Sequence, residues 1–207
     1  MQEINVFFQI FILIFSVMIH EISHGYMARI FGDKTAEYEG RLTLNPVKHI
    51  YIFGTIILPL FLWLTNVGFM IGWAKPVPYN PYNLKSRKVA EPLVAFAGPF
   101  SNILIALVFG ALIRFLNGSP DFYPLVVLFA FIVLVNISLA IFNLIPIPPL
   151  DGSKILFSII PLGNRFVFSE FAQRYGLILI IAVVAFLPGF LSKAIFWVFS
   201  LITGIGV

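Results

Sequence analysis

The sequence predicts an all-α polytopic membrane protein with about 4–6 transmembrane segments and a small membrane-associated β/loop region after the first helix. Of its 207 residues, 60% are apolar and 11% are charged, and the mean hydropathy is +1.00. Ordinary soluble domains are about 45–50% apolar and roughly 25% charged. These values exclude a soluble globular protein and a disordered chain. We interpret residues 1–207 as a single integral-membrane domain, multi-pass in the cell membrane.

The first apolar segment covers residues 4–31 and is long enough to span a bilayer, which takes about 20 residues. It carries three ionisable residues, His20, Glu21 and His24. Residues 32–49 are polar, and the pattern around Gly40 allows two short strands at 34–38 and 41–44. An ordinary basic loop is the alternative there. Strands would offer an edge to which an extended substrate could add.

The second apolar segment, residues 51–73, is interrupted by Pro59 and by Thr65-Asn-Val-Gly68. Residues 74–92 are rich in Pro, Asn and basic residues and predict a loop. The third and fourth segments, 93–116 and 122–144, form a hairpin through a short link. A mixed stretch, 153–175, precedes the fifth segment at 176–202, which is broken near Pro188-Gly189.

The net charge is +4, and we attribute it to basic loops facing the cytoplasm and anionic lipid, not to a nucleic-acid partner. If the second segment re-enters the membrane instead of crossing it, ten basic residues share one face, opposite Arg114. These are Lys34, Arg41, Lys48, Lys75, Lys85, Arg87, Lys88, Lys154, Arg165 and Arg174. The positive-inside rule favours this arrangement, with that face cytoplasmic.

The first segment contains His20-Glu21-Ile22-Ser23-His24, an H-E-x-x-H pattern. Histidines at i and i+4 lie on one face of a helix and can bind one Zn²⁺. The adjacent Glu21 can act as general base on zinc-bound water. A chance match or a polar cluster that joins helices is the alternative, but ionisable groups at membrane depth are costly.

A catalytic zinc site needs a third protein ligand, and the chain has no cysteine, which also excludes disulfides. Asp151 is the best candidate, because it follows a Pro-rich stretch and precedes Gly152 at the end of the fourth segment. It could equally cap a helix over residues 153–160. His49 stands in a loop and is interpreted as a solvated residue.

Two asparagines could also take part. Asn143 lies near the end of the fourth segment and Asn102 near the start of the third. Each could donate a hydrogen bond to a substrate or to an oxyanion, and each could simply join helices. Gly98 is interpreted as allowing close helix packing.

Three blocks of the sequence together resemble the signatures of the site-2 protease family of intramembrane zinc metalloproteases. They are His20-Glu-Ile-Ser-His24, Ala97-Gly-Pro-Phe-Ser-Asn102 and Asn143-Leu-Ile-Pro-Ile-Pro-Pro-Leu-Asp151-Gly152. Two further stretches, 40–46 and 72–78, resemble the compact prokaryotic branch without a PDZ domain. The resemblance implies that His20, His24 and Asp151 bind one zinc ion, that Glu21 is catalytic, and that Asn143 lies near the scissile bond.

The resemblance further implies that the substrates are membrane proteins, cleaved within or next to a transmembrane helix inside the lipid bilayer. A non-catalytic metal-binding protein, such as a zinc transporter, is the first alternative. Transporters more often carry repeated halves, and this sequence shows no repeat. A scaffold protein is the second alternative, and it would not require Glu21 between two histidines.

Overall fold

The structure is a computed structural model that describes residues 5–49, 51–57, 60–61, 64–65, 75–116, 118, 120–160, 174–176 and 178–206. Within these residues all the regular structure is helical. The helices and turns are α1 (Val6–Ile30), α2 (Thr35–Tyr38), η1 (Pro46–Lys48), η2 (Ile52–Ile57), η3 (Pro81–Asn83), α4 (Arg87–Leu116), η4 (Pro120–Phe122), α5 (Tyr123–Asn143), α6 (Asp151–Ile159) and α8 (Pro188–Thr203).

Three helical stretches are long and apolar enough to cross a membrane: Val6–Ile30, Arg87–Leu116 and Pro120–Asn143. A fourth is obtained if Arg174–Phe186 and Pro188–Thr203, which meet at a bend of 76°, count as one broken span. The predicted break near Pro188 is therefore present. The expected 4–6 segments are not confirmed, and most of the second segment lies outside the described residues.

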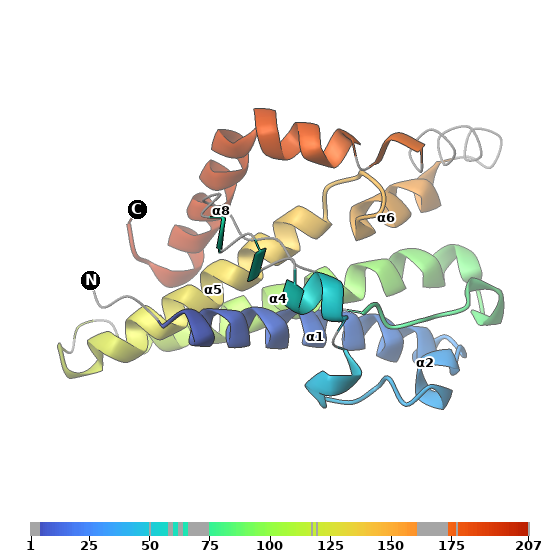
Figure 1. Cartoon of the computed structure of the whole chain (residues 1–207), viewed down its shortest axis with the longest axis horizontal. Helices are drawn as coiled ribbons and strands as arrows, with labels where there is room; N and C mark the ends of the chain where they lie inside the picture. Colours follow the sequence, from blue (N-terminus) through green and yellow to red (C-terminus); the bar gives the residue numbers. More distant parts are fainter. Residues whose placement is uncertain are drawn as a thin grey trace.

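The long helices α1, α4 and α5 lie side by side (Figure 1). Ala106, Ile113, Val133 and Ile137 of α4 and α5 form the main buried cluster with Phe199 of α8. Since lipid offers no hydrophobic drive for helix association, such contacts hold the helices together by close packing. This three-helix arrangement leaves α6 to pack against α4 at one end of the bundle (Figure 1).

Residues that follow α1 and residues that precede α4 lie at the same end of the bundle. The Lys85 amide donates to the Phe31 carbonyl at 2.8 Å, and the Lys75 amide donates to the His49 carbonyl at 2.9 Å. His49 and Lys75 therefore lie at the same end of the bundle, although 25 residues separate them in the sequence. A single crossing of a hydrocarbon core about 30 Å thick would separate these two residues, which agrees with the predicted re-entry. The route between residues 57 and 75 lies largely outside the described residues.

The predicted strands at 34–38 and 41–44 are wrong: the first is the helical turn α2 and the second is irregular. The carboxylate of Asp33 accepts hydrogen bonds from the Thr35 amide and hydroxyl at 3.1 and 2.5 Å, which turns the backbone into a helix. The guanidinium of Arg41 donates to the carbonyls of Lys48, Lys75 and Pro76. Side-chain bonds to the backbone thus replace strand pairing, and substrate addition to an edge at 34–44 loses its basis.

Asp33 also fastens the two loops to each other. It is buried and accepts hydrogen bonds from the Asn80 amide at 2.6 Å and from Asn83 Nδ2 at 3.0 Å. Burial acts to raise the pKa of Asp33, but these bonds and those from Thr35 favour the charged form more strongly and hold the pKa below its ordinary value. A charged carboxylate therefore fixes the loop that leads into α4.

Helix α4 begins at Arg87, earlier than the predicted start at residue 93. The Arg87 guanidinium donates to the Glu91 carboxylate one turn later, at 2.6 Å. Pro92 and Pro99 both lie inside the helix. Pro92 and the charged residues from Arg87 onward therefore belong to the first turns of α4, whereas residues 75–86 form the predicted loop, with one short turn at Pro81–Asn83.

Candidate metal centre

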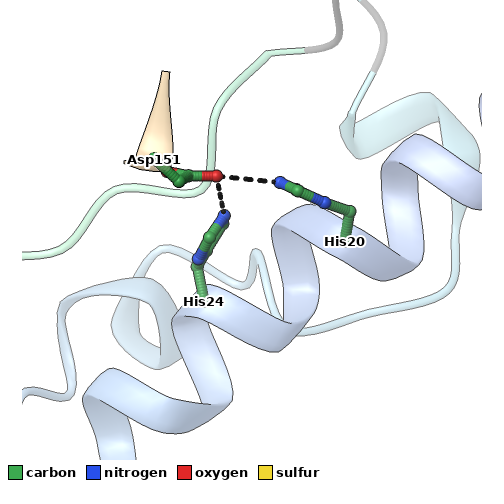
Figure 2. A group of neighbouring side chains, drawn as sticks. All are labelled: His20, His24 and Asp151. Atoms are coloured by element: carbon green, nitrogen blue, oxygen red, sulfur yellow. Dashed lines mark hydrogen bonds and ion pairs between the residues drawn. The ribbon is translucent and has the colours of Figure 1, made fainter. Parts of the chain in front are cut away.

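The side chains of His20 and His24 on α1 point toward Asp151, the first residue of α6 (Figure 2). Both Nε2 atoms lie 3.1 Å from the same oxygen, Asp151 Oδ2. The three residues are buried, and their ligand atoms lie within 4.8 Å of one another. The H-E-x-x-H spacing therefore brings both imidazoles to one side of α1, and the fold adds a carboxylate from a helix 127 residues away in the chain.

The other ring nitrogens of the two histidines are held by hydrogen bonds. His20 Nδ1 is 2.6 Å from Asn102 Oδ1, and His24 Nδ1 is 2.6 Å from the Val94 carbonyl. Both partners are oxygen atoms of α4, so each can accept the Nδ1 proton. Each Nε2 then carries a lone pair toward Asp151. This is the arrangement of metal-binding imidazoles, whose second nitrogen donates to an oxygen nearby.

Glycine at position 98 of α4 lets both imidazole rings lie directly against this helix. A Cβ on this residue would lie 2.4 Å from His24 Nε2 and 2.5 Å from His20 Nε2. These separations are far below van der Waals contact and only slightly longer than a Zn–N bond of about 2.0–2.1 Å. Two imidazoles and one carboxylate that converge in this way fit a zinc ion. Gly98 therefore does more than allow helix packing.

Asp151 is not the N-cap of α6, which is Leu150. Its second oxygen, Oδ1, accepts a hydrogen bond from Lys154 Nζ at 3.2 Å. The ammonium group of Lys154 beside Oδ1 favours the charged form of Asp151, which is the form that binds metals. The capping interpretation fits this geometry poorly.

Glu21 is held by the extended segment 75–80, which passes beside α1. The Val77 amide donates to Glu21 Oε2 at 2.9 Å. Val77 stands between Pro76 and Pro78, which have no N–H, so it is the single backbone donor of this Pro-Val-Pro stretch. Arg41 fixes the same segment by donating to the Lys75 carbonyl at 2.9 Å and the Pro76 carbonyl at 3.2 Å.

The remaining residues singled out in the sequence lie elsewhere. Asn143 is the last residue of α5, and its Nδ2 donates to the Leu139 carbonyl at 2.9 Å. Asn102 is fully buried behind His20. His49 is buried, not solvated as expected, and its Nε2 lies 2.8 Å from the Thr43 carbonyl. Burial lowers the pKa of His49 below its ordinary value, and the charge of Arg41 adds to this.

Sequence reasoning missed Val77, Arg41 and Asn136 as neighbours of the site. The Pro-Val-Pro pattern was a signal for Val77, because it isolates one backbone donor. Asn136 was signalled by its place inside an almost wholly apolar helix, where a polar residue needs a partner. Arg41 had no local signal for its contact with segment 75–80, since these two partners, Lys75 and Pro76, lie 34 and 35 residues away in the sequence.

Comparison with known proteins agrees with this geometry. The profile of Peptidase family M50 matches residues 8–127 and 120–187. The chain is 38% identical over 183 residues to "Putative zinc metalloprotease YwhC" of Bacillus subtilis, covering 83% of this chain and 77% of that protein. It is 30% identical over 190 residues to "Putative zinc metalloprotease Rip2" of Mycobacterium tuberculosis, covering 90% of this chain and 70% of that protein.

A further relative, "Zinc metalloprotease MJ0392" of Methanocaldococcus jannaschii, is 27% identical over 152 residues, which are 73% of this chain and 34% of that protein. No solved structure gives a significant match. The family match covers more than half of the chain and favours a protease over a transporter or a scaffold. The chain belongs to peptidase family M50, the site-2 protease family, and is a membrane zinc metalloprotease.

Proposed function

We propose that this peptidase hydrolyses peptide bonds within or next to transmembrane segments of other proteins of the cell membrane. In this proposal His20, His24 and Asp151 hold one Zn²⁺ per chain. The observation that carries it is the convergence of two imidazoles and one carboxylate on a buried point. When bound, zinc acts as a Lewis acid on a peptide carbonyl and lowers the pKa of water at the site.

The depth of the site supports cleavage inside the bilayer. Ten residues, about 15 Å of helix, separate His20 from Ile30 at the end of α1. That is about half of a hydrocarbon core roughly 30 Å thick. A substrate helix hides its carbonyls in its own hydrogen bonds, so it must unfold locally before one of them reaches this depth.

Glu21 is the general base of this proposal. Its carboxylate takes a proton from the attacking water and later delivers it to the leaving amine. The hydrogen bond from the Val77 amide to Oε2 supports this role, because it restricts the rotation of the carboxylate and leaves Oε1 outside that bond. In this proposal segment 75–80 holds the Glu21 carboxylate in place through the Val77 amide.

Asn143 is proposed to bind the substrate near the scissile bond. Its Nδ2 uses one hydrogen on the Leu139 carbonyl, and an amide has a second hydrogen and an acceptor oxygen. Asn143 is only partly buried and begins the turn that leads to Asp151. It is therefore suited to donate to a substrate carbonyl.

The test is cleavage of a co-expressed single-span membrane protein, with products mapped by mass spectrometry. Glu21→Gln should keep the zinc and the fold but reduce cleavage by at least about 10²-fold. Glu39→Gln makes the same chemical change on an exposed residue outside the site and should cleave as the wild type does. Removing zinc with a chelator should stop wild-type cleavage, and zinc should restore it. Undiminished cleavage by Glu21→Gln would refute the role of Glu21.

A further inference from the structure

Two buried asparagines behind His20 form a chain of hydrogen bonds through three helices. Asn102 of α4 accepts from His20 Nδ1 at 2.6 Å, and its Nδ2 donates to Asn136 Oδ1 of α5 at 2.8 Å. Asn136 Nδ2 donates to Ser16 Oγ of α1 at 3.0 Å. Both asparagines are fully buried, and Ser16 is nearly so. No substrate can reach these amides, so they do not act as substrate donors.

The direction of this chain is fixed by main-chain carbonyls, which can only accept hydrogen bonds. Asn136 Nδ2 also donates to the Ile132 carbonyl at 2.9 Å, so the amide oxygen of Asn136 must face Asn102. Asn102 Nδ2 also donates to the Ser16 carbonyl at 3.3 Å, so the oxygen of Asn102 must face His20. If either amide group were rotated by 180°, its oxygen would face a main-chain carbonyl oxygen. The hydrogen bond between Asn102 and Asn136 would also be lost.

We propose that Asn102 and Asn136 are positioning residues that hold His20 in the tautomer protonated at Nδ1. An amide oxygen facing Nδ1 accepts that proton and leaves the lone pair on Nε2, the atom turned toward Asp151. This inference rests on the proposed zinc site, because it assigns the reason why His20 can serve as a ligand there.

The Nδ1 protons of the two histidines are held by different kinds of acceptor. His24 donates to the Val94 carbonyl, which belongs to the backbone of α4 and needs no orientation. His20 lies one turn earlier and faces a side chain, whose amide can rotate. Asn136 supplies the missing constraint from α5. Zinc binding should therefore depend on Asn136. His20 donates to a side chain that Asn136 orients, whereas His24 donates to a backbone carbonyl.

The test compares variants at both asparagines, using zinc affinity by chelator competition and the tautomer of His20 in metal-free protein by ¹⁵N NMR at alkaline pH. The chain has only three histidines, so the His20 signals are assigned with one substitution. Asn102→Leu should lose the Nδ1-protonated tautomer and bind zinc about 10–100-fold more weakly. Asn136→Leu should change both quantities in the same direction and to a smaller extent.

Asn102→Asp separates positioning from helix packing. A carboxylate still accepts from His20 Nδ1 but cannot donate to Ser16 or Asn136, so thermal stability should fall while the tautomer and the zinc affinity are kept. Ser138→Ala removes another α5 side chain, one bonded only within its own helix at 2.7 Å, and should change neither quantity.

Two results would overturn the proposal: a wild-type tautomer and zinc affinity in Asn102→Leu, or a loss of zinc in Asn102→Asp as large as in Asn102→Leu. Should Asn102→Leu not fold, Asn102→Asp and Asn136→Leu decide the question with the same readouts. If the wild type bound no zinc, the proposed function would fail instead, and the tautomer of the metal-free protein would still test this inference.

Discussion

The substitution Gly98→Ala adds one methyl group beside His20 and His24, two of the proposed metal ligands, and replaces neither of them. In the structure that methyl group would lie 2.4 Å from His24 Nε2, 2.5 Å from His20 Nε2 and 2.6 Å from His24 Cε1. Alanine is a better helix former than glycine by about 1 kcal/mol, so α4 itself is not weakened. The damage should therefore fall on the metal site and not on the fold.

The size of the effect follows from these distances. Ordinary van der Waals contact begins at 3.4 Å, so each Nε2 atom must move by about 1 Å relative to the new methyl group. Metal–ligand bonds tolerate deviations of only about 0.2 Å. Two of the three ligands are displaced together. Changes behind a ligand usually weaken metal binding by 10–100-fold, and we expect Gly98→Ala to exceed about 100-fold.

The assay is zinc stoichiometry and chelator competition on purified protein in detergent, with thermal unfolding to verify the fold. Gly189→Ala is the matched control, since it also replaces a helical glycine but its Cβ would meet nothing within 4 Å. It should bind zinc as the wild type does. Wild-type zinc affinity in a folded Gly98→Ala protein would show that the metal does not bind between α1 and residue 98.

Three further predictions concern the surroundings of the site. Val77→Pro removes the amide that bonds to the proposed general base, Glu21, and should lower kcat with zinc retained. Val77→Ala keeps this amide and should be close to wild type, and equal kcat values in both variants would refute the proposed support of Glu21. Burial lowers the pKa of His49 in the folded protein, so the unfolded chain alone takes up this proton below about pH 6.5. The free energy of unfolding should be fully present above that pH and decrease below it, by at most about 1.4 kcal/mol per pH unit, and His49→Gln should show a smaller decrease in denaturant titrations. Single cysteines at the exposed positions Val47 and Tyr82 should both be shielded from a membrane-impermeant thiol reagent in intact cells, and one at Asp121 should react; shielding of only one of the first two would contradict re-entry of residues 51–73.

The sequence by itself determined the features that depend on local geometry. A long apolar segment must form a helix in lipid, and a helix places residues i and i+4 on one face. His20 and His24 therefore had to share a side of α1 before any tertiary contact was known. The proline-rich turn before Asp151 likewise marked the end of α5 and an acidic residue beside it.

The errors of the sequence analysis lie in the polar segments. Alternation around Gly40 indicated strands, but Asp33 accepts hydrogen bonds from Thr35 at the start of a helical turn, and Arg41 donates to the carbonyls of Lys48, Lys75 and Pro76. His49 looked like a solvated loop residue and is buried. The bonds between Asp33 and Thr35 are local, but two partners of Arg41 lie 34 and 35 residues away, and the burial of His49 depends on how the loops pack, which a local pattern does not decide.

The tertiary structure alone decided how the site is completed. Gly98, Asn102 and Asn136 act on the histidines across helix interfaces, and which of their atoms face the site depends on how α4 and α5 are rotated against α1. That rotation is set by packing over the whole length of the helices and not by any short motif. The sequence could therefore suggest which residues form the proposed site, whereas their distances, their closeness to Gly98 and the direction of the hydrogen bonds behind them required the packed bundle.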